Sequence, residues 1–152
     1  MKIFVTVGTT QFDSLIEFLD NNLDHEDDVL LQIADGKYKP KNFKFIEFTK
    51  DINMIYKEYD YIITHAGAGT IYKLLELRKS FIVVPNMDRV DQHQTDIANF
   101  LEENFYALNC TDYNDIIPSL KKLSLIDLNI YEKESFFKIE EICDFIKSSF
   151  NS

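Results

Sequence analysis

The chain has 152 residues, the length of one domain, and it can bury a core without disulfide or metal staples. Hydrophobic residues make up 45% and charged residues 28%, which excludes a disordered, collagen-like or disulfide-rich chain. Acidic residues outnumber basic ones by 26 to 16, and the formal net charge of −10 argues against binding nucleic acid over a broad surface.

Four strands are predicted in the first half, each from a short apolar run: residues 3–7, 29–33, 43–48 and 61–64. A first helix is predicted from apolar residues that recur at helical spacing, which are Phe12, Leu15, Leu19 and Leu23. Thr10 followed by Asp13 has the pattern of a capping box, which would begin this helix. Asp51 then caps a short second helix that runs through Tyr56.

The second half continues the alternation of strands and helices. Its predicted elements are, in order, a helix over 71–78, a strand over 81–84, a helix from Asp91, a strand over 106–108 and a helix over 112–123. We expect Pro118 to kink or shorten the last of these helices. The alternation predicts a single α/β domain over residues 1–152, with a mostly parallel sheet that binds ligands beyond the carboxyl ends of its strands.

A carboxyl-terminal helix is predicted from about 132 to 150, with a wide apolar face. We expect this helix to pack on its own sheet; docking onto a partner or onto a second copy of the chain is the alternative. Its mixed charges argue against a membrane-surface helix. Apolar runs fall short of the roughly 18 residues of a membrane span. Cys110 and Cys143 lack metal-ligand spacing, so we expect a cytoplasmic protein with reduced thiols.

A loop of small residues follows the strand over 61–64 and precedes a helix. Its residues are His65, Ala66, Gly67, Ala68, Gly69 and Thr70. The two glycines permit a tight turn and a close approach of a ligand, and the amino terminus of the next helix favours a phosphate. A dinucleotide fingerprint fails because Tyr72 occupies the third glycine position. A phosphate site and a plain strand-to-helix turn remain as alternatives.

Two further segments are expected at the same edge of the sheet. Asp91 and Gln94 form a capping pair for the helix after the strand over 81–84, and together with His93 they offer hydrogen bonds to a sugar or phosphate. His93 has no second ligand at metal spacing, so no metal site is predicted. The segment over 8–10 ends the first strand, where a loop with a capping threonine is the simpler interpretation.

Taken together, three ordered segments resemble the Alg13-type glycosyltransferase subunits. Residues 4–16 resemble the amino-terminal signature, residues 61–70 the nucleotide-sugar loop, and residues 81–86 followed by 91–94 the third block of that family. The resemblance runs in register from residue 1 to about residue 108. It implies a Rossmann-like, mostly parallel α/β sheet flanked by helices. This is the carboxyl-terminal, donor-binding half of a GT-B glycosyltransferase similar to family 28 and to the peptidoglycan enzyme MurG.

The resemblance also implies an activity and a set of partners. The chain would be the catalytic, donor-binding subunit of a two-component inverting enzyme that uses a UDP-sugar and neither a metal nor another cofactor. A separate, Alg14-like membrane-associated subunit would bind the acceptor, a polyprenyl-diphosphate-linked sugar. The product would belong to the dolichol pathway or to a bacterial capsule or exopolysaccharide. The chain would then work at the cytoplasmic face of a membrane through its partner, with a homo-oligomer as a further option.

Site residues follow from the resemblance position by position. Those implied to face the diphosphate are Gly67, Ala68, Gly69 and Thr70. Asp91 and Gln94 would contact the sugar hydroxyls of the donor. Residues implied at the junction with the acceptor half are Gly8, Thr9 and Thr10. The wider substrate-binding set adds His65, Ala66, Asn86 and His93, and the general base is expected in the partner rather than in this chain.

One departure from the family bears on the ribose of the donor. Relatives carry Glu six positions after the glycine equivalent to Gly67, and here Lys73 stands there. Glu76 lies one helical step along and is the substitute for the ribose contact. Two rival functions stay open: a non-catalytic scaffold subunit with a decayed donor site, and an unrelated nucleotide-binding α/β protein. A Glu76 that points away from the cleft would favour the scaffold.

Overall fold

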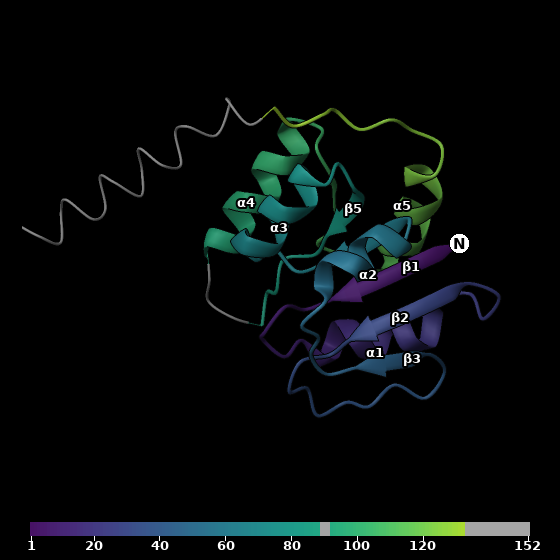
Figure 1. Cartoon of the computed structure of the whole chain (residues 1–152). Coiled ribbons are helices and arrows are strands. Elements are labelled where there is room, and N and C mark those ends of the chain that lie inside the picture. Colours follow the sequence, from purple (N-terminus) through teal and green to yellow (C-terminus); the bar gives the residue numbers. More distant parts are fainter. Residues whose placement is uncertain (89–91, 133–152) are drawn as a thin grey trace, which may run out of the picture.

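Six parallel strands form one sheet in the order β3-β2-β1-β4-β5-β6 (Figure 1). The computed structural model describes residues 1–88 and 92–132. In chain order the strands are β1 Lys2–Thr6, β2 Asp28–Gln32, β3 Lys44–Ile46, β4 Tyr61–Thr64, β5 Ser80–Val83 and β6 Leu108–Asn109. The sheet grows in one direction from β1 to β3 and then in the other from β4 to β6. The loops after β1 and β4 therefore part at a topological switch point.

Helices cover both faces of this sheet. One face carries α1 (Asp13–Asn22) and α5 (Ile116–Leu123), which is preceded by a 3₁₀ turn, η1 (Tyr113–Asp115). The other face carries α2 (Ile52–Glu58), α3 (Ala68–Glu76) and α4 (Gln92–Glu103). The predicted α/β fold with a parallel sheet is confirmed.

The central strand β1 shows how the sequence builds two cores. Ile3 and Val5 belong to the core under α1 and α5, and Phe4 between them belongs to the core under α2, α3 and α4. All three side chains are fully buried. A continuous apolar run is typical of a parallel strand that is covered on both faces, so β1 could be predicted from its composition.

The long connection from β2 to β3 is held by one buried carboxylate. Asp20 of α1 is fully buried, and its oxygens accept hydrogen bonds from the backbone N–H groups of Lys41 (2.8 Å) and Asn42 (3.0 Å) and from the Tyr38 hydroxyl (2.7 Å). Burial raises the pKa of Asp20, but these hydrogen bonds outweigh it and leave the pKa below its usual value. Ionised Asp20 therefore fastens this connection to α1.

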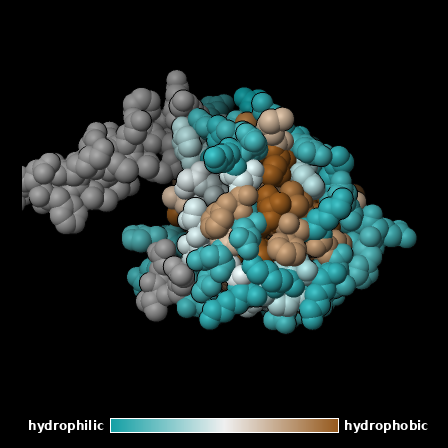
Figure 2. All heavy atoms as spheres, turned by 60° about the horizontal axis from the view of Figure 1, so that its bottom comes forward, coloured by the Kyte–Doolittle hydropathy of each residue, from teal (hydrophilic) through white to brown (hydrophobic). Residues whose placement is uncertain are grey.

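The edge strand β3 is short and partly apolar on its outside. Figure 2 looks onto the side of the molecule that lies at the bottom of Figure 1, and it shows hydrophobic residues gathered within a largely hydrophilic surface. Phe45 and Phe48 are 38% and 56% exposed. Lys39 forms an ion pair with Glu47 at 2.9 Å, and its Nζ lies 6.0 Å from the centre of the Phe45 ring. Charges beside an edge strand oppose pairing with another sheet.

The capping box predicted at the start of the first helix is wrong. The residue that caps α1 is Phe12, which makes no side-chain cap hydrogen bond. Asp13 instead accepts hydrogen bonds from the backbone N–H groups of Lys37 (3.1 Å) and Tyr38 (3.2 Å). The proposed capping box with Thr10 does not form, because a loop distant in sequence uses the carboxylate.

Several predicted boundaries shift. The helix predicted from residue 71 starts at Ala68, the strand predicted over 43–48 is limited to Lys44–Ile46, and the strand predicted over 106–108 is Leu108–Asn109. Pro118 stands in the first turn of α5, and a 3₁₀ turn replaces the start of the predicted helix over 112–123. A first-turn proline gives up no intrahelical hydrogen bond, so α5 accommodates Pro118, and the helix is shorter than predicted because η1 takes the place of its start.

Two predictions fall on parts of the chain outside the described residues. They are the carboxyl-terminal helix from about 132 to 150 and the role of Asp91 at the start of its helix. Within residues 1–88 and 92–132, none of the helices combines the length and the apolar character that a bilayer span requires.

Candidate functional site

The predicted site residues gather at the carboxyl edge of the sheet. Residues 8–10 follow β1, residues 65–67 follow β4, and residues 86–88 follow β5. These three strands are neighbours in the order β1-β4-β5, so their ends lie side by side. Ligands of open α/β sheets bind at this edge, next to the switch point between β1 and β4.

A buried polar network holds the loop after β1. The Thr6 hydroxyl donates to Gln32 Oε1 at 2.6 Å and accepts from the backbone N–H of Gly8 at 3.1 Å. The Gln32 amide donates to the Gly8 carbonyl at 3.4 Å. Thr6 and Gln32 are both buried, so their bonds face little competition from water. The loop is therefore fixed in place before any ligand arrives.

The imidazole of His65 lies between two glycines of the site. A Cβ atom built on Gly8 would lie 2.6 Å from His65 Cε1, and one built on Gly67 would lie 2.2 Å from His65 Nε2. Gly8 also has φ +65°, a left-handed conformation that glycine adopts without strain. Both glycines are thus required by the ring that they enclose, which ties the loop after β1 to the loop after β4.

His65 is held as a neutral imidazole at pH 7. Burial lowers the pKa of this side chain, and a hydrogen bond with the Thr6 backbone opposes that effect without cancelling it. Since the usual pKa of histidine is already below 7, the lowered value keeps the ring uncharged. The sequence assigned His65 no chemistry, and the structure gives it a positioning role between Gly8 and Gly67.

The first turn of α3 is open to solvent. Gly67 precedes the helix in an extended conformation, and the bond from the Ile71 N–H to the Gly67 carbonyl (3.0 Å) closes the first turn. The backbone N–H groups of residues 68–70 lie before this first bond and, as at every helix start, have no acceptor within the helix. A Cβ built on Gly69 would meet no atom within 4 Å. This turn can therefore receive an anion.

The backbone of Thr70 belongs to the first turn of α3, and its side chain contacts Tyr56. Its hydroxyl forms a hydrogen bond with the Tyr56 hydroxyl, which lowers the pKa of Tyr56 against the larger raising effect of burial. Tyr56 is buried in the core below α3. The Thr70 side chain thus anchors the amino end of α3 to α2.

Lys73 and Glu76 form an ion pair farther along α3. Lys73 Nζ and Glu76 Oε2 are 3.8 Å apart, and the two side chains are 39% and 31% exposed. Glu76 ends the helix, about 12 Å along the axis from Ala68 at 1.5 Å per residue. Lys73 lies one turn beyond Gly69. The substitute carboxylate is thus far from the helix start.

The loop after β5 is built around Asn86, which is 5% exposed. Gln94 Oε1 accepts the backbone N–H of Asn86 at 3.0 Å, and Asn86 Oδ1 accepts the backbone N–H of Asp88 at 3.1 Å. Gln94 and Asn86 are brought together as expected for one rim. His93 lies beside them in the exposed first turn of α4.

A cavity of about 240 Å³ lies between the loops that follow β1 and β5. Its lining residues are Gln11, Phe12, Asp13, Ser14, Asn86 and Asp88. The Ser14 hydroxyl donates to Asp88 Oδ2 at 3.1 Å and lies 2.8 Å from the Tyr113 hydroxyl. The roles of Ser14, Asp88 and Tyr113 cannot be predicted from the sequence, because contacts across 74 and 99 residues leave no local pattern.

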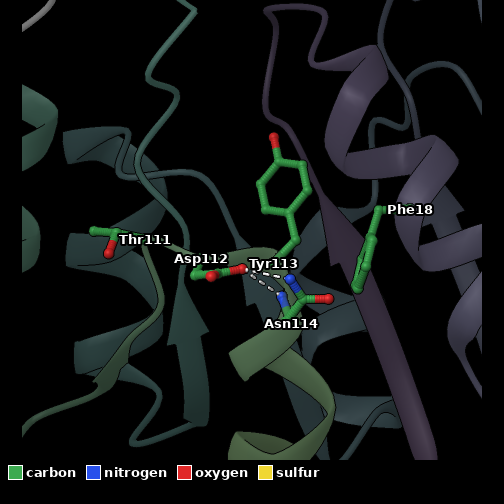
Figure 3. A pocket seen from close by; sticks show the side chains of 5 residues that line it. All are labelled: Phe18, Thr111, Asp112, Tyr113 and Asn114. Atoms are coloured by element: carbon green, nitrogen blue, oxygen red, sulfur yellow. Dashed lines mark hydrogen bonds between the residues drawn. The ribbon is translucent and has the colours of Figure 1, made fainter.

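A second, shallower hollow of about 540 Å³ lies on the other side of Tyr113, between α1 and η1. In Figure 3 the rings of Tyr113 and Phe18 stand near each other, with Thr111, Asp112 and Asn114 along the η1 side. The dashed lines mark the two 2.9 Å hydrogen bonds by which Asp112 holds Asn114. Across residues 1–88 and 92–132, His, Cys, Asp and Glu form no group of three that could hold a metal ion.

The family model of the glycosyltransferase family 28 C-terminal domain matches residues 2–148. The chain belongs to this family. The mouse UDP-N-acetylglucosamine transferase subunit ALG13 is 33% identical over 128 residues, which cover 72% of this chain and 11% of that protein. The chain thus spans about a tenth of the length of this relative. The predicted family resemblance is confirmed.

Solved structures agree on the fold. An NMR structure of ALG13 has a TM-score of 0.64 and 20% identity, and the match covers 91% of this chain and 94% of that one. The crystal structure of Acinetobacter baumannii MurG has a TM-score of 0.61 and 22% identity, over 83% of this chain and 42% of that one. The predicted equivalence to one half of a GT-B glycosyltransferase is confirmed at the level of the fold.

Proposed function

We propose that the chain is the donor-binding, catalytic subunit of a two-component inverting glycosyltransferase that transfers a hexose or N-acetylhexosamine from a UDP-sugar. The observation that carries this proposal is the open first turn of α3 beside the two loops that enclose His65. Backbone amides and the helix dipole favour a diphosphate at such a turn. Membership of a glycosyltransferase family supports the class of reaction.

In the proposed reaction, an acceptor hydroxyl attacks the anomeric carbon of the donor sugar from the face opposite UDP. The bond from that carbon to the diphosphate oxygen breaks, and UDP leaves with the electron pair. The backbone amides of residues 68–70 stabilise the charge that grows on the diphosphate, so the proposal uses no metal ion. A general base takes the proton of the acceptor, and we assign this base to a partner protein.

The proposed partner is an Alg14-like, membrane-associated subunit that binds a polyprenyl-diphosphate-linked sugar. Two comparisons support a divided enzyme: the mouse relative is named a transferase subunit, and the chain matches only 42% of the MurG chain. The loop over residues 8–10 ends β1 at the edge where such a partner would close the site. The complex would work at the cytoplasmic face of a membrane.

A non-catalytic scaffold subunit is the second candidate, and the Lys73–Glu76 ion pair favours it. Lys73 stands where relatives carry the ribose-binding carboxylate, and Glu76 is neutralised at the far end of α3. Such a subunit would stabilise its partner and bind UDP weakly. The two candidates differ in whether the isolated chain or the complex binds a UDP-sugar.

Calorimetric titration tests the proposal. The purified chain, alone and co-expressed with an Alg14-like partner, is titrated with UDP, UDP-N-acetylglucosamine, UDP-galactose and NAD. We expect a UDP-sugar to bind and NAD not to bind. Gly69→Ala should weaken binding without loss of stability, because its new Cβ projects into the open space that the ligand would occupy.

Binding that Gly69→Ala weakens supports the donor subunit and identifies the sugar class. No binding of any UDP-sugar, even with the partner present, would refute the donor role and leave the scaffold. Equal binding of free nucleotides with no preference for a sugar diphosphate would favour an unrelated nucleotide-binding protein. Leu125→Ala serves as a matched control, because this side chain is 83% exposed and lies after α5.

A further inference from the structure

We propose that a face formed by β2, β3 and α2 rests directly on an anionic lipid bilayer, with Phe48 and Met54 among the headgroups and lysines beside the lipid phosphates. This surface is named the β3–α2 face. Its apolar residues are Leu30, Ile46, Phe48, Ile52, Met54 and Ile55. The inference rests on the proposed function, which places the chain at a membrane, and adds a direct contact with lipid to the contact made through a partner.

The short helix α2 leaves part of the sheet uncovered. It lies over β1, where the Tyr56 ring packs edge-on against Phe4 with centroids 5.9 Å apart. Neighbouring strands are about 4.8 Å apart, so β3 lies about 10 Å from β1, beyond the roughly 5 Å that a helix over β1 reaches to each side. On this side Leu30 of β2 and Ile46 of β3 are half-buried, whereas Leu31 in the core under α1 is fully buried. In the described part of the chain, the apolar sheet therefore stays open beyond α2.

Exposed apolar side chains lie beside this opening. Residues 47–51 connect β3 to α2, and Phe48 in this connection is 56% exposed. Met54 in α2 is 71% exposed, and Ile52 and Ile55 of the same helix pack against the core and are half-buried. Figure 2 looks onto the β3 side of the molecule and shows hydrophobic residues gathered among hydrophilic ones. Apolar surface gathered in this way, with a polar rim, marks an interaction site.

The charges around this face are mostly positive. Residues 37–50 carry five lysines and one acidic residue, Glu47, which is itself paired with a lysine at 2.9 Å. Lys44 is two residues from Ile46 in β3 and therefore shares the α2 side of the strand, and Lys50 lies just before α2. Both of these lysine side chains are exposed. The chain as a whole carries a charge of −10, so this segment is a local basic region on an acidic protein.

An anionic bilayer fits this face better than a second copy of the chain. A symmetric pair of these faces would bring the lysines of residues 37–50 against each other, and like charges repel. Asp51 and Glu58 at the ends of α2 oppose Lys57 and leave the lysines of residues 37–50 in excess. Acidic residues elsewhere on the chain act weakly here, because physiological salt screens charges beyond about 8 Å. Aromatic and apolar side chains beside lysines are typical of surfaces that enter the headgroup region.

Binding to vesicles tests this inference. Flotation measures binding of the full chain to vesicles of phosphatidylcholine alone and to vesicles of equal parts phosphatidylcholine and phosphatidylglycerol. We expect binding to the anionic vesicles, with less binding as the salt concentration rises. The mixture contains no nucleotide, sugar or partner protein, so the result does not depend on the donor site.

Variants of the face should weaken this binding. Lys44→Gln combined with Lys50→Gln should lower the affinity for anionic vesicles about fivefold for each lysine. Phe48→Ala should lower it about tenfold, because the ring no longer leaves water. Matched controls lie on the other face of the sheet, in α5 or just after it, and are Lys121→Gln with Lys122→Gln, and Leu125→Ala. Thermal midpoints check that each variant is folded.

A fluorescent reporter locates the contact. The chain has no tryptophan, so Phe48→Trp introduces a single indole on the face. Its emission should move to shorter wavelength when anionic vesicles are added, because the indole leaves water for the headgroup region. Leu125→Trp is the control, and its emission should stay unchanged because this position is on the other face and 83% exposed.

The inference is overturned if anionic vesicles do not bind the protein, or if the face variants bind them as tightly as the controls. It is also overturned if the emission of Phe48→Trp shifts with a co-expressed partner and not with vesicles, because a protein then covers the face. Failure of the proposed function looks different: UDP-sugars fail to bind with the partner present. The vesicle results decide the inference in that case too, because they need no nucleotide.

Discussion

Gly67→Ala should destabilise the protein through a clash with His65. The new Cβ would lie 2.2 Å from His65 Nε2, well inside contact distance, and Gly8 also lies close to the Cε1 and Nε2 atoms of the ring. Overpacking of this kind costs roughly 1–3 kcal/mol, and loss of glycine before a helix adds a few tenths. We expect a loss of about 2 kcal/mol, or about 4–8 °C in Tm for a domain of this size.

The assay is urea unfolding followed by circular dichroism, with the midpoint compared at constant m-value. In a His65→Ala background the clash is absent, so Gly67→Ala should then cost under about 1 kcal/mol. Gly69→Ala is the control two residues away: its Cβ meets open space, and alanine suits a helix better by roughly 0.5–1 kcal/mol. Equal costs of Gly67→Ala in both backgrounds would refute the role of the ring.

Three further predictions concern Asp20, Gln94 and Lys73. Asp20→Asn should cost about 2–3 kcal/mol. The pKa of Asp20 is lower in the folded protein than its unfolded value near 3.8, so ionised Asp20 stabilises the fold fully above that value, and this stabilisation is lost as the pH falls through the folded pKa. The urea midpoints of the unmodified protein and of Asp20→Asn should therefore converge in acid. A difference between the two midpoints that does not change with pH would contradict this. Gln94→Leu should cost about 1 kcal/mol of stability, because the backbone N–H of Asn86 loses its acceptor. Gln94→Glu retains an acceptor oxygen and should leave the Tm unchanged. Equal losses in the two variants would argue against the hydrogen bond. Lys73→Glu should lower the Kd of UDP in calorimetry, and an unchanged Kd would place the ribose elsewhere.

The sequence predicted the sheet well, because its signal is local. Strands such as Ile3 to Val7 are apolar runs bounded by glycine and polar residues, and the alternation with helices specifies a parallel sheet. For α3 the apolar pattern predicts a start at residue 71, three residues after the observed start at Ala68. Ala68, Gly69 and Thr70 carry no apolar periodicity, and glycine is a poor helix former, so the pattern predicts a loop where the first turn of α3 lies.

Of the candidate site, the sequence predicts which loops form it but not the contacts between them. Gly8, Gly67 and Asn86 follow strand ends, so their shared edge followed from the fold class. The ring of His65 between two glycines is a contact between segments almost sixty residues apart, and no spacing rule reports it. Asp13 is a second case. The local sequence predicts that it takes part in a capping box, but its carboxylate accepts hydrogen bonds from the backbone of a distant loop.

Tyr113 stands between two hollows of the surface. Its hydroxyl meets Ser14 at the rim of the smaller cavity, while its ring lines the larger one beside Phe18 (Figure 3). A change at Tyr113 would therefore alter both hollows at once, because one side chain supplies the hydroxyl that meets Ser14 and the ring that packs against Phe12 and Phe18.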